Sequence, residues 1–240
     1  MAKTNILEIK NISKSFKTNK TLNNISLNIP KGQIFGLIGV NGIGKTTLIK
    51  IILDLLRSDK GSIKLFGINS TEKDSRSNIA YLPEKFQPSI YLKGHEFLKL
   101  SVGYFNKKYD EKKALSFAKD LDLRASSLNE RVNKYSKGMG QKLGLISILL
   151  SEAPLLILDE PMSGLDPHVR IKLKDLLKDY AKKGNTVFFS SHILSDMEEI
   201  CDRIGVIHQS ELNFEGTPKQ LKAKYKSENL ERAFLEIISK

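Results

Sequence analysis

The stretch GVNGIGKTT at residues 39–47 restricts the fold of this 240-residue chain more than any other feature. It follows the apolar run QIFGLIG and precedes KTTLIKIILDLL, in which apolar residues recur at helical spacing. The stretch fits the pattern G-x-x-x-x-G-K-[ST]. The glycines of this pattern let backbone N–H groups turn toward phosphate oxygens at the positive end of a helix dipole. We therefore predict a strand, a phosphate-binding loop and a helix.

Each part of this loop has a predicted role in binding a nucleotide. Lys45 is expected to reach the β- and γ-phosphates, and Thr46 to offer its hydroxyl group to Mg²⁺. A glycine-rich turn without a ligand is the alternative, and the flanking strand and helix disfavour it. The residues expected to bind the nucleotide here are Gly39, Val40, Asn41, Gly42, Ile43, Gly44, Lys45, Thr46 and Thr47.

The segment LLILDE at residues 155–160 predicts the second half of the same site. Four apolar residues followed by two acids are typical of a buried parallel strand that carries carboxylates at its C-terminal edge, where ligands bind. Asp159 is placed to hold Mg²⁺ through water, and Glu160 to act as the base for an attacking water. Without the glycine loop, such a strand would indicate only the start of a loop.

The order of the remaining segments predicts an α/β fold. Residues 6–65 indicate strands with one helix, and residues 85 to about 150 indicate Lys-rich helices that form an inserted subdomain. After residue 154, the strands PLLILDE, NTVFFSS and RIGVIHQ alternate with helices at about 166–183 and 193–201. This alternation favours a parallel sheet with helices on both faces.

The charge of the chain predicts an acidic partner. Lys and Arg number 39 against 27 Asp and Glu, which gives a formal net charge of +12. Nucleotides, anionic lipid headgroups and nucleic acid are all attracted to such a surface.

Neither a membrane span nor secretion is expected. No apolar run approaches the 18 or more residues of a spanning helix, and the first residues alternate between polar and apolar, unlike a signal peptide. The single cysteine, Cys201, fits a reducing compartment and is expected to be a small buried side chain.

Three further segments complete an ordered set of motifs. YSKGMGQKLGLISILL lies between the two halves of the site, and SGLDP and SSHILSDMEEICDRIGVI follow them. This set resembles the ATP-binding cassette (ABC) family, in particular the ATP-binding subunits of export-type ABC transporters. The resemblance implies one P-loop NTPase domain over residues 1–240, with a mixed sheet core and an N-terminal antiparallel β region. It also implies an α-helical subdomain at about 85–150 and a short helical tail at 217–240.

The resemblance also assigns roles to individual residues. Phe16 lies where the family places an aromatic ring against adenine. Glu84 takes the place of the usual glutamine, which ligates Mg²⁺, senses the γ-phosphate and links to the membrane subunit. His192 matches the histidine that holds the γ-phosphate and the attacking water. Lys45, Glu160 and His192 are thus the expected catalytic residues, and Thr46, Glu84 and Asp159 the expected metal ligands.

The family signature is recognisable at Ser136, Gly138 and Met139. The resemblance implies that Ser136 and the backbone around Gly138 contact the γ-phosphate bound by a partner subunit. Lys137 and Met139 replace the usual glycine and glutamine, so Met139 lacks the amide group with which the family bonds ribose. Asp166 matches a residue that carries contacts across the dimer, and it is equally suited to cap a helix before a proline.

The function implied by the resemblance is ATP hydrolysis coupled to transport. Two copies are expected to close head to tail on two Mg-ATP molecules and to drive a separate transmembrane permease, with export favoured. The protein is then expected in the cytoplasm, peripheral on the inner face of the cell membrane. The cargo, the permease, and the choice between an identical and a paralogous partner stay open.

Two other functions are less consistent with the sequence. A soluble cassette ATPase acting on nucleic acid or ribosomes would suit the basic charge. However, only one glycine loop is present, and residues 46–158 are too few for a long coiled-coil insertion, so nucleic acid is not an expected partner. A P-loop kinase or GTPase is disfavoured because no Asn-Lys-x-Asp motif occurs, and a small-molecule kinase would need neither the signature nor His192.

Overall fold

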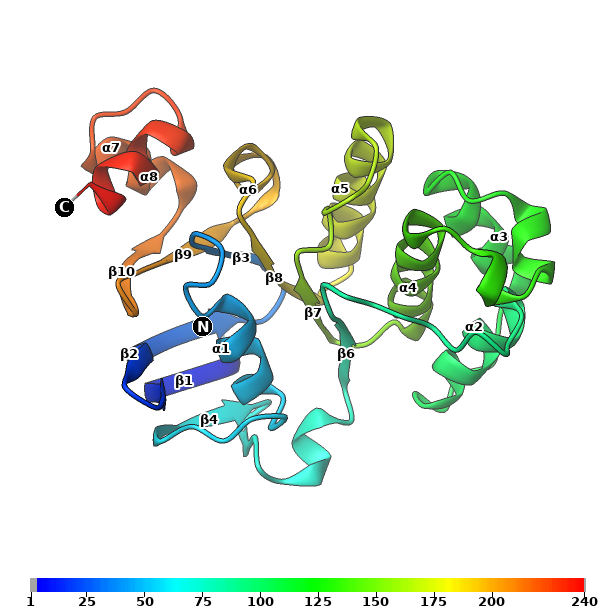
Figure 1. Cartoon of the computed structure of the whole chain (residues 1–240), viewed down its shortest axis with the longest axis horizontal. Coiled ribbons are helices and arrows are strands. Elements are labelled where there is room, and N and C mark those ends of the chain that lie inside the picture. The colour runs from blue at the N-terminus through cyan, green and yellow to red at the C-terminus, as the bar shows by residue number, and fades with distance from the viewer. Residues whose placement is uncertain (1–3, 240) are drawn as a thin grey trace.

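Two β-sheets organise residues 4–239, the part of the chain that our computed structural model describes (Figure 1). The antiparallel sheet has the order β2-β1-β4-β5. Buried and exposed side chains alternate along much of β1 and β2, because only one face of each strand packs against the core. Its strands are β1 (Asn5–Phe16), β2 (Asn19–Pro30), β4 (Lys60–Leu65) and β5 (Ile68–Asn69).

The mixed sheet has the order β10-β9-β3-β8-β7-β6. Neighbouring strands are parallel except for the antiparallel pair β9–β10. Every residue of β3, β7 and β8 is buried, which explains their continuous apolar runs. The strands are β3 (Ile34–Ile38), β6 (Ile79–Leu82), β7 (Leu155–Asp159), β8 (Thr186–Ser191), β9 (Arg203–His208) and β10 (Glu211–Gly216).

Helices connect the strands and cover the mixed sheet. They are α1 (Lys45–Ile52), α2 (Gly94–Gly103), α3 (Glu111–Asp120), α4 (Lys137–Ser151), α5 (Pro167–Lys182), α6 (Leu194–Ile200), α7 (Pro218–Lys224) and α8 (Leu230–Ile238). Short 3₁₀ turns occur at η1 (Lys73–Arg76), η2 (Ala125–Asn129) and η3 (Val132–Lys134).

The helices α2, α3 and α4 lie together at one end of the molecule, beyond the edge strand β6 (Figure 1). Both α2 and α3 pack against α4. This arrangement agrees with the helical region expected from the sequence, and its boundaries at about 85–150 stay a prediction. The tail helices α7 and α8 lie at the opposite end (Figure 1).

Two apolar cores lie on opposite faces of the mixed sheet. One contains α1 and the buried face of the antiparallel sheet, and the other contains residues of α4 to α8. The sequence predicts helices on both faces. The antiparallel region that the resemblance implies lies beside α1 on one of these faces. The α/β fold with a mixed sheet is confirmed.

The alternation along β7 sets the direction of its last residue. Leu155 and Ile157 belong to the core that contains α1, whereas Leu156 and Leu158 belong to the other core. Asp159 therefore falls on the face of the sheet where α1 begins.

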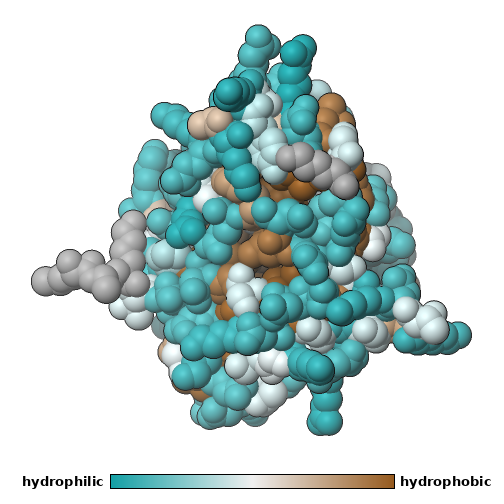
Figure 2. All heavy atoms as spheres, turned by 90° about the vertical axis from the view of Figure 1, so that its left-hand side faces the viewer, coloured by the Kyte–Doolittle hydropathy of each residue, from teal (hydrophilic) through white to brown (hydrophobic). Residues whose placement is uncertain are grey.

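The surface is largely hydrophilic on the side where α7, α8, β10 and β2 lie. In Figure 2, apolar atoms on this side are visible mainly in a central hollow. Within residues 4–239, no helix combines the length and apolar content that crossing a membrane requires.

Candidate active site

A pocket of about 420 Å³ opens at the N-terminal end of α1. The strands β3, β8 and β7 are neighbours and parallel, so their C-terminal ends meet at this edge of the sheet. The residues that line the pocket are Asn41, Gly42, Gly44, Lys45, Thr46, Thr47, Glu84, Glu160, Ser163 and His192. The fold thus brings together residues that lie far apart in the sequence.

The glycine loop is held close to β2. Gly44 has a φ of 115°, and a Cβ atom at this position would lie 2.9 Å from the carbonyl oxygen of Thr21. Only glycine meets both constraints without strain. Lys45 follows directly, and its Nζ atom donates to the carbonyl oxygens of Gly39 at 2.7 Å and Val40 at 3.4 Å. The loop therefore places a buried cation at the start of α1.

Two hydroxyl groups hold the carboxylate of Asp159. Thr46 Oγ1 donates to Oδ2 at 2.7 Å, and Ser190 Oγ donates to Oδ1 at 2.6 Å. Asp159 is buried, and its neighbour Tyr81 has a pKa raised to about 12, by burial first and then by the charge of Asp159. A hydroxyl oxygen and a carboxylate are hard ligands of the kind Mg²⁺ prefers, so this pair fits the predicted metal site.

Few protein ligands are expected at such a site. Among residues 4–239, no group of three or more His, Cys, Asp or Glu side chains is arranged to hold a metal ion. Mg²⁺ commonly binds through one or two carboxylates together with water and substrate phosphates. Thr46, Asp159 and Glu84 are consistent with that type of site.

Glu160 lies between the loop lysine and the histidine. Its Oε1 atom is 3.3 Å from Lys45 Nζ, and its Oε2 atom is 2.9 Å from His192 Nδ1. The backbone N–H of Glu160 donates to Ser190, at 3.2 Å to the carbonyl oxygen and 3.1 Å to Oγ. Oε1 is buried and has no hydrogen bond with any described residue. One carboxylate oxygen is thus oriented, and the other can accept a hydrogen bond from water.

The structure adds two serines that the sequence did not single out. Ser163 lines the pocket, and Ser190 bonds both Asp159 and Glu160. Ser190 is directly opposite Asp159 in the β7–β8 register. The sequence feature that could have identified Ser190 is its position in the run TVFFSS, at the end of a buried strand.

Several predicted residues do not line this pocket. Phe16 ends β1 and is 47% exposed, with Lys14 Nζ 5.6 Å from the centre of its ring. Asp166 occupies the N-cap position of α5 before Pro167, and its side chain makes no capping hydrogen bond. Their roles toward nucleotide stay predictions.

The signature residues lie at the N-terminus of α4. Ser136 is the N-cap residue, and its Oγ accepts a hydrogen bond from the backbone N–H of Met139 at 3.2 Å. Gly138 lies in the same first turn. None of the three lines the glycine-loop pocket. Within one chain, the signature and the glycine loop therefore remain separate.

A groove of about 620 Å³ extends from Glu84 to the signature. It combines apolar side chains with two lysines. Its lining consists of Glu84, Lys85, Phe86, Gln87, Pro88, Ile90, Val132, Tyr135, Ser136, Lys137, Gly140 and Gln141. Glu84 belongs to both this groove and the glycine-loop pocket, so it connects them.

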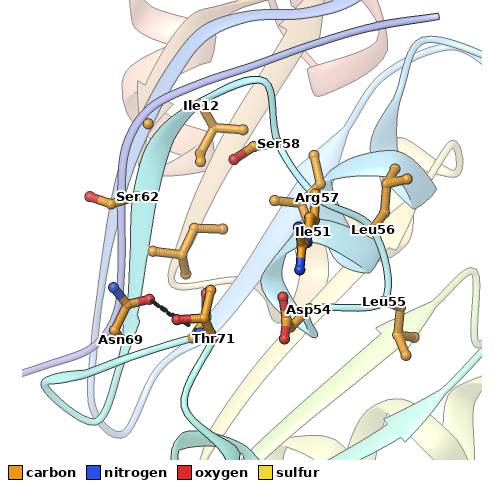
Figure 3. A pocket seen from close by; sticks show the side chains of 13 residues that line it. Ile12, Ile51, Asp54, Leu55, Leu56, Arg57, Ser58, Ser62, Asn69 and Thr71 are labelled. Atoms are coloured by element: carbon orange, nitrogen blue, oxygen red, sulfur yellow. Dashed lines mark hydrogen bonds between the residues drawn. The ribbon is translucent and has the colours of Figure 1, made fainter.

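Another pocket, of about 640 Å³, lies between the C-terminal end of α1 and the strands β4 and β5 (Figure 3). Asp54, Arg57, Asn69 and Thr71 are among its polar lining residues, and Thr71 Oγ1 donates to Asn69 Oδ1 at 3.1 Å. None of the predicted site residues lines it.

The fold and the glycine-loop site define a P-loop nucleoside triphosphatase. The profile of the family described as ABC transporter matches residues 22–163. The chain therefore belongs to the ABC transporter family, as its motifs predicted.

Comparisons with individual proteins also identify ABC transporter ATP-binding proteins as similar to this chain. An ABC transporter ATP-binding protein of Nostoc is 38% identical over 84% of this chain and 61% of its own length. This chain thus spans about three fifths of that relative. A lantibiotic transport ATP-binding protein of Streptococcus pyogenes is 34% identical over 95% of this chain and 96% of its own. A solved ATP-binding subunit of an ABC transporter superposes with a TM-score of 0.86 at 27% identity, covering 96% of this chain and 98% of the other.

Proposed function

We propose that this chain is the ATP-binding and ATP-hydrolysing subunit of an ABC transporter. Two copies close head to tail on two Mg-ATP molecules and drive a separate transmembrane permease. The observation that carries the proposal is the position of Glu160, held between Lys45 and His192 in the glycine-loop pocket.

The glycine loop binds the triphosphate in this proposal. The first N–H groups of α1 and the ammonium group of Lys45 are directed at the β- and γ-phosphates. Thr46, Asp159 and Glu84 hold Mg²⁺, which neutralises phosphate charge when bound. Phe16 stacks on adenine from the end of β1.

Glu160 acts as the general base. Its Oε1 atom accepts a proton from a water molecule as the water oxygen attacks the γ-phosphorus, and the bond to the ADP oxygen breaks. The hydrogen bond between His192 and Oε2 orients the carboxylate, so that the other oxygen faces the water.

A second copy of the chain completes the site. Ser136 and Gly138 lie at the N-terminus of α4, where a hydroxyl group and backbone N–H groups can bind an anion. Because these residues do not line the pocket of their own chain, the proposal assigns them to the γ-phosphate held by the partner. Binding of ATP then favours the closed dimer, and hydrolysis favours its reopening.

The groove between Glu84 and Ser136 is the docking site for the permease. Its apolar lining includes the exposed side chain of Ile90, and Lys85 and Lys137 add positive charge. A permease segment in this groove would contact the site through Glu84, and the protein would sit on the inner face of the cell membrane. The similarity to a lantibiotic transport protein supports export as the direction.

Glu160→Gln tests the proposal with two measurements. The variant is expected to lose ATP hydrolysis and to elute as a dimer with saturating Mg-ATP in size-exclusion chromatography with light scattering. Glu231→Gln, an exposed change on α8, is the control and is expected to match the wild type. Hydrolysis at the wild-type rate by Glu160→Gln would refute the base assignment. The proposed dimer would be refuted if Glu160→Gln stayed monomeric at saturating Mg-ATP, both alone in solution and together with the co-purified membrane complex.

A further inference from the structure

The helix α6 connects the histidine of the site to the end of the chain. It begins at Leu194, two residues after His192, and contains only seven residues. In Figure 1, it lies between α5 on one side and the tail helices α7 and α8 on the other. A helix this short is not stable by itself, so its contacts on these two sides determine its orientation.

On the α5 side, α6 is held by ion pairs, of which those to Asp196 are the more buried. Asp196 is 3% exposed, and its Oδ2 accepts a hydrogen bond from Arg170 at 2.5 Å. Lys174 Nζ lies 3.4 Å from the other oxygen of Asp196 and also bonds Glu199. These contacts join the start of α6 to the helix that follows Asp166.

On the tail side, Glu198 makes polar contacts with both tail helices. Glu198 Oε1 accepts a hydrogen bond from Lys222 of α7. Its Oε2 atom accepts one from the backbone N–H of Leu230, the first residue of α8, at 3.1 Å. A carboxylate at a helix N-terminus also interacts favourably with the helix dipole.

Apolar contacts accompany these polar ones. Met197 and Ile200 of α6 are buried in the same core as Leu230, Ala233 and Ile237 of α8. The tail therefore packs against α6 over an apolar surface, and Glu198 bonds both tail helices at this contact.

We propose that Glu198 is a positioning residue for ATP hydrolysis. By holding α7 and α8 against α6, it keeps His192 oriented toward Glu160, and the tail sets the rate of the chemical step. This inference rests on the proposed function, because it takes His192 and Glu160 as parts of the hydrolytic site. ATP itself is bound by the glycine loop, which Glu198 does not contact.

The test compares Glu198→Ala with Glu231→Ala. Glu231 is an exposed residue in the first turn of α8, and its side chain has no partner among the described residues, so it is a matched control. Glu198→Ala is expected to lower kcat by about tenfold, with KM for ATP within about twofold of the wild type. Glu198→Gln keeps an acceptor for the Leu230 N–H and is expected to restore part of kcat.

Hydrogen exchange provides a readout that does not need hydrolysis. Amides of residues 192–200 are expected to exchange faster in Glu198→Ala, and those of α1 at the wild-type rate. Lys222→Met, which leaves the α8 contact intact, is the second variant if Glu198→Ala folds poorly, and it is expected to give a smaller effect of the same kind. Unchanged kcat and unchanged exchange would overturn the inference, as would a rise in KM alone. A wild-type protein that does not hydrolyse ATP would refute the proposed function, whereas the exchange comparison would still test the role of Glu198.

Discussion

The ammonium group of Lys45 lies 3.3 Å from the carboxylate of Glu160. Both side chains are less than a tenth exposed, so their attraction is weakly screened. A triphosphate that binds at the glycine loop therefore competes with Glu160 for the same cation. Binding would turn Lys45 toward phosphate and release Oε1 of Glu160 for water. The proposed phosphate-binding residue and the proposed base are thus in contact before any nucleotide binds.

Replacement of Lys45 tests this link. Lys45→Met is expected to weaken ATP binding by about tenfold or more, because a charge-assisted contact to phosphate is lost. The measurement is titration with a fluorescent ATP analogue. Lys50→Met, an exposed change on the same helix, is the control and should bind as the wild type does. Equal affinity of Lys45→Met and the wild type would exclude the phosphate role of Lys45.

Phe16 offers a separate test of how the base is recognised. Phe16→Ala is expected to weaken nucleotide binding by about 1–3 kcal/mol, the range measured when an aromatic side chain stacked on a base is removed. Phe16→Tyr keeps the flat ring and should bind normally. Because stacking does not distinguish bases, ATP and GTP affinities should fall by a similar factor. An unchanged nucleotide affinity in Phe16→Ala would contradict the stacking role of Phe16.

The sequence predicted four strands of the mixed sheet, β3, β7, β8 and β9, and did not predict the edge strands β6 and β10. The runs in β3, β7 and β8 are apolar throughout, since both faces of these strands are covered. The antiparallel strands β1 and β2 show one buried face, but alternation does not say what that face packs against. Their position beside α1 depends on tertiary packing and could not be derived from the pattern.

The candidate site was predictable where a local motif carries the chemistry. Lys45 and Glu160 belong to continuous motifs, and the parallel sheet brings their strand ends together. Ser190 was missed because its contact with Asp159 depends on the register between β7 and β8. Register between strands separated by a helix follows from packing of the whole sheet, so a single sequence does not fix it.

Asp159→Asn tests the metal site. Thr46 and Ser190 donate to different oxygens of Asp159, and an amide replaces one of these oxygens with an NH2 donor, so one of the two hydrogen bonds is lost. The amide also removes the charge that attracts Mg²⁺. The expected result is that added Mg²⁺ no longer stimulates hydrolysis at concentrations that saturate the wild type. Asp179→Asn on the exposed part of α5 is the control. The same Mg²⁺ dependence in Asp159→Asn and the wild type would contradict the assignment.

The lowered pKa of Glu152 predicts how the stability of the fold depends on pH. It follows α4, and hydrogen bonds from Lys107 first and then Lys113 lower its pKa from 4.5 to about 2. A carboxylate whose pKa is lower in the folded state stabilises the fold at pH values above its unfolded pKa, and this contribution is lost as the pH falls through the folded pKa. The window is therefore pH 4.5 down to about 2.

Glu152→Gln is accordingly expected to lower the free energy of unfolding at pH 7. The side chain is 46% exposed, so solvent screening limits the loss to about 1 kcal/mol. Urea unfolding of both proteins at pH 7 and at pH 3 measures the difference. It should shrink at pH 3, because Glu152 of the unfolded chain is protonated there while the folded carboxylate is still mostly ionised. Glu130→Gln, an exposed change in the same helical region, should show no such convergence. A difference that stays constant from pH 7 to pH 3 would mean that the two lysines do not stabilise the fold through the charge of Glu152.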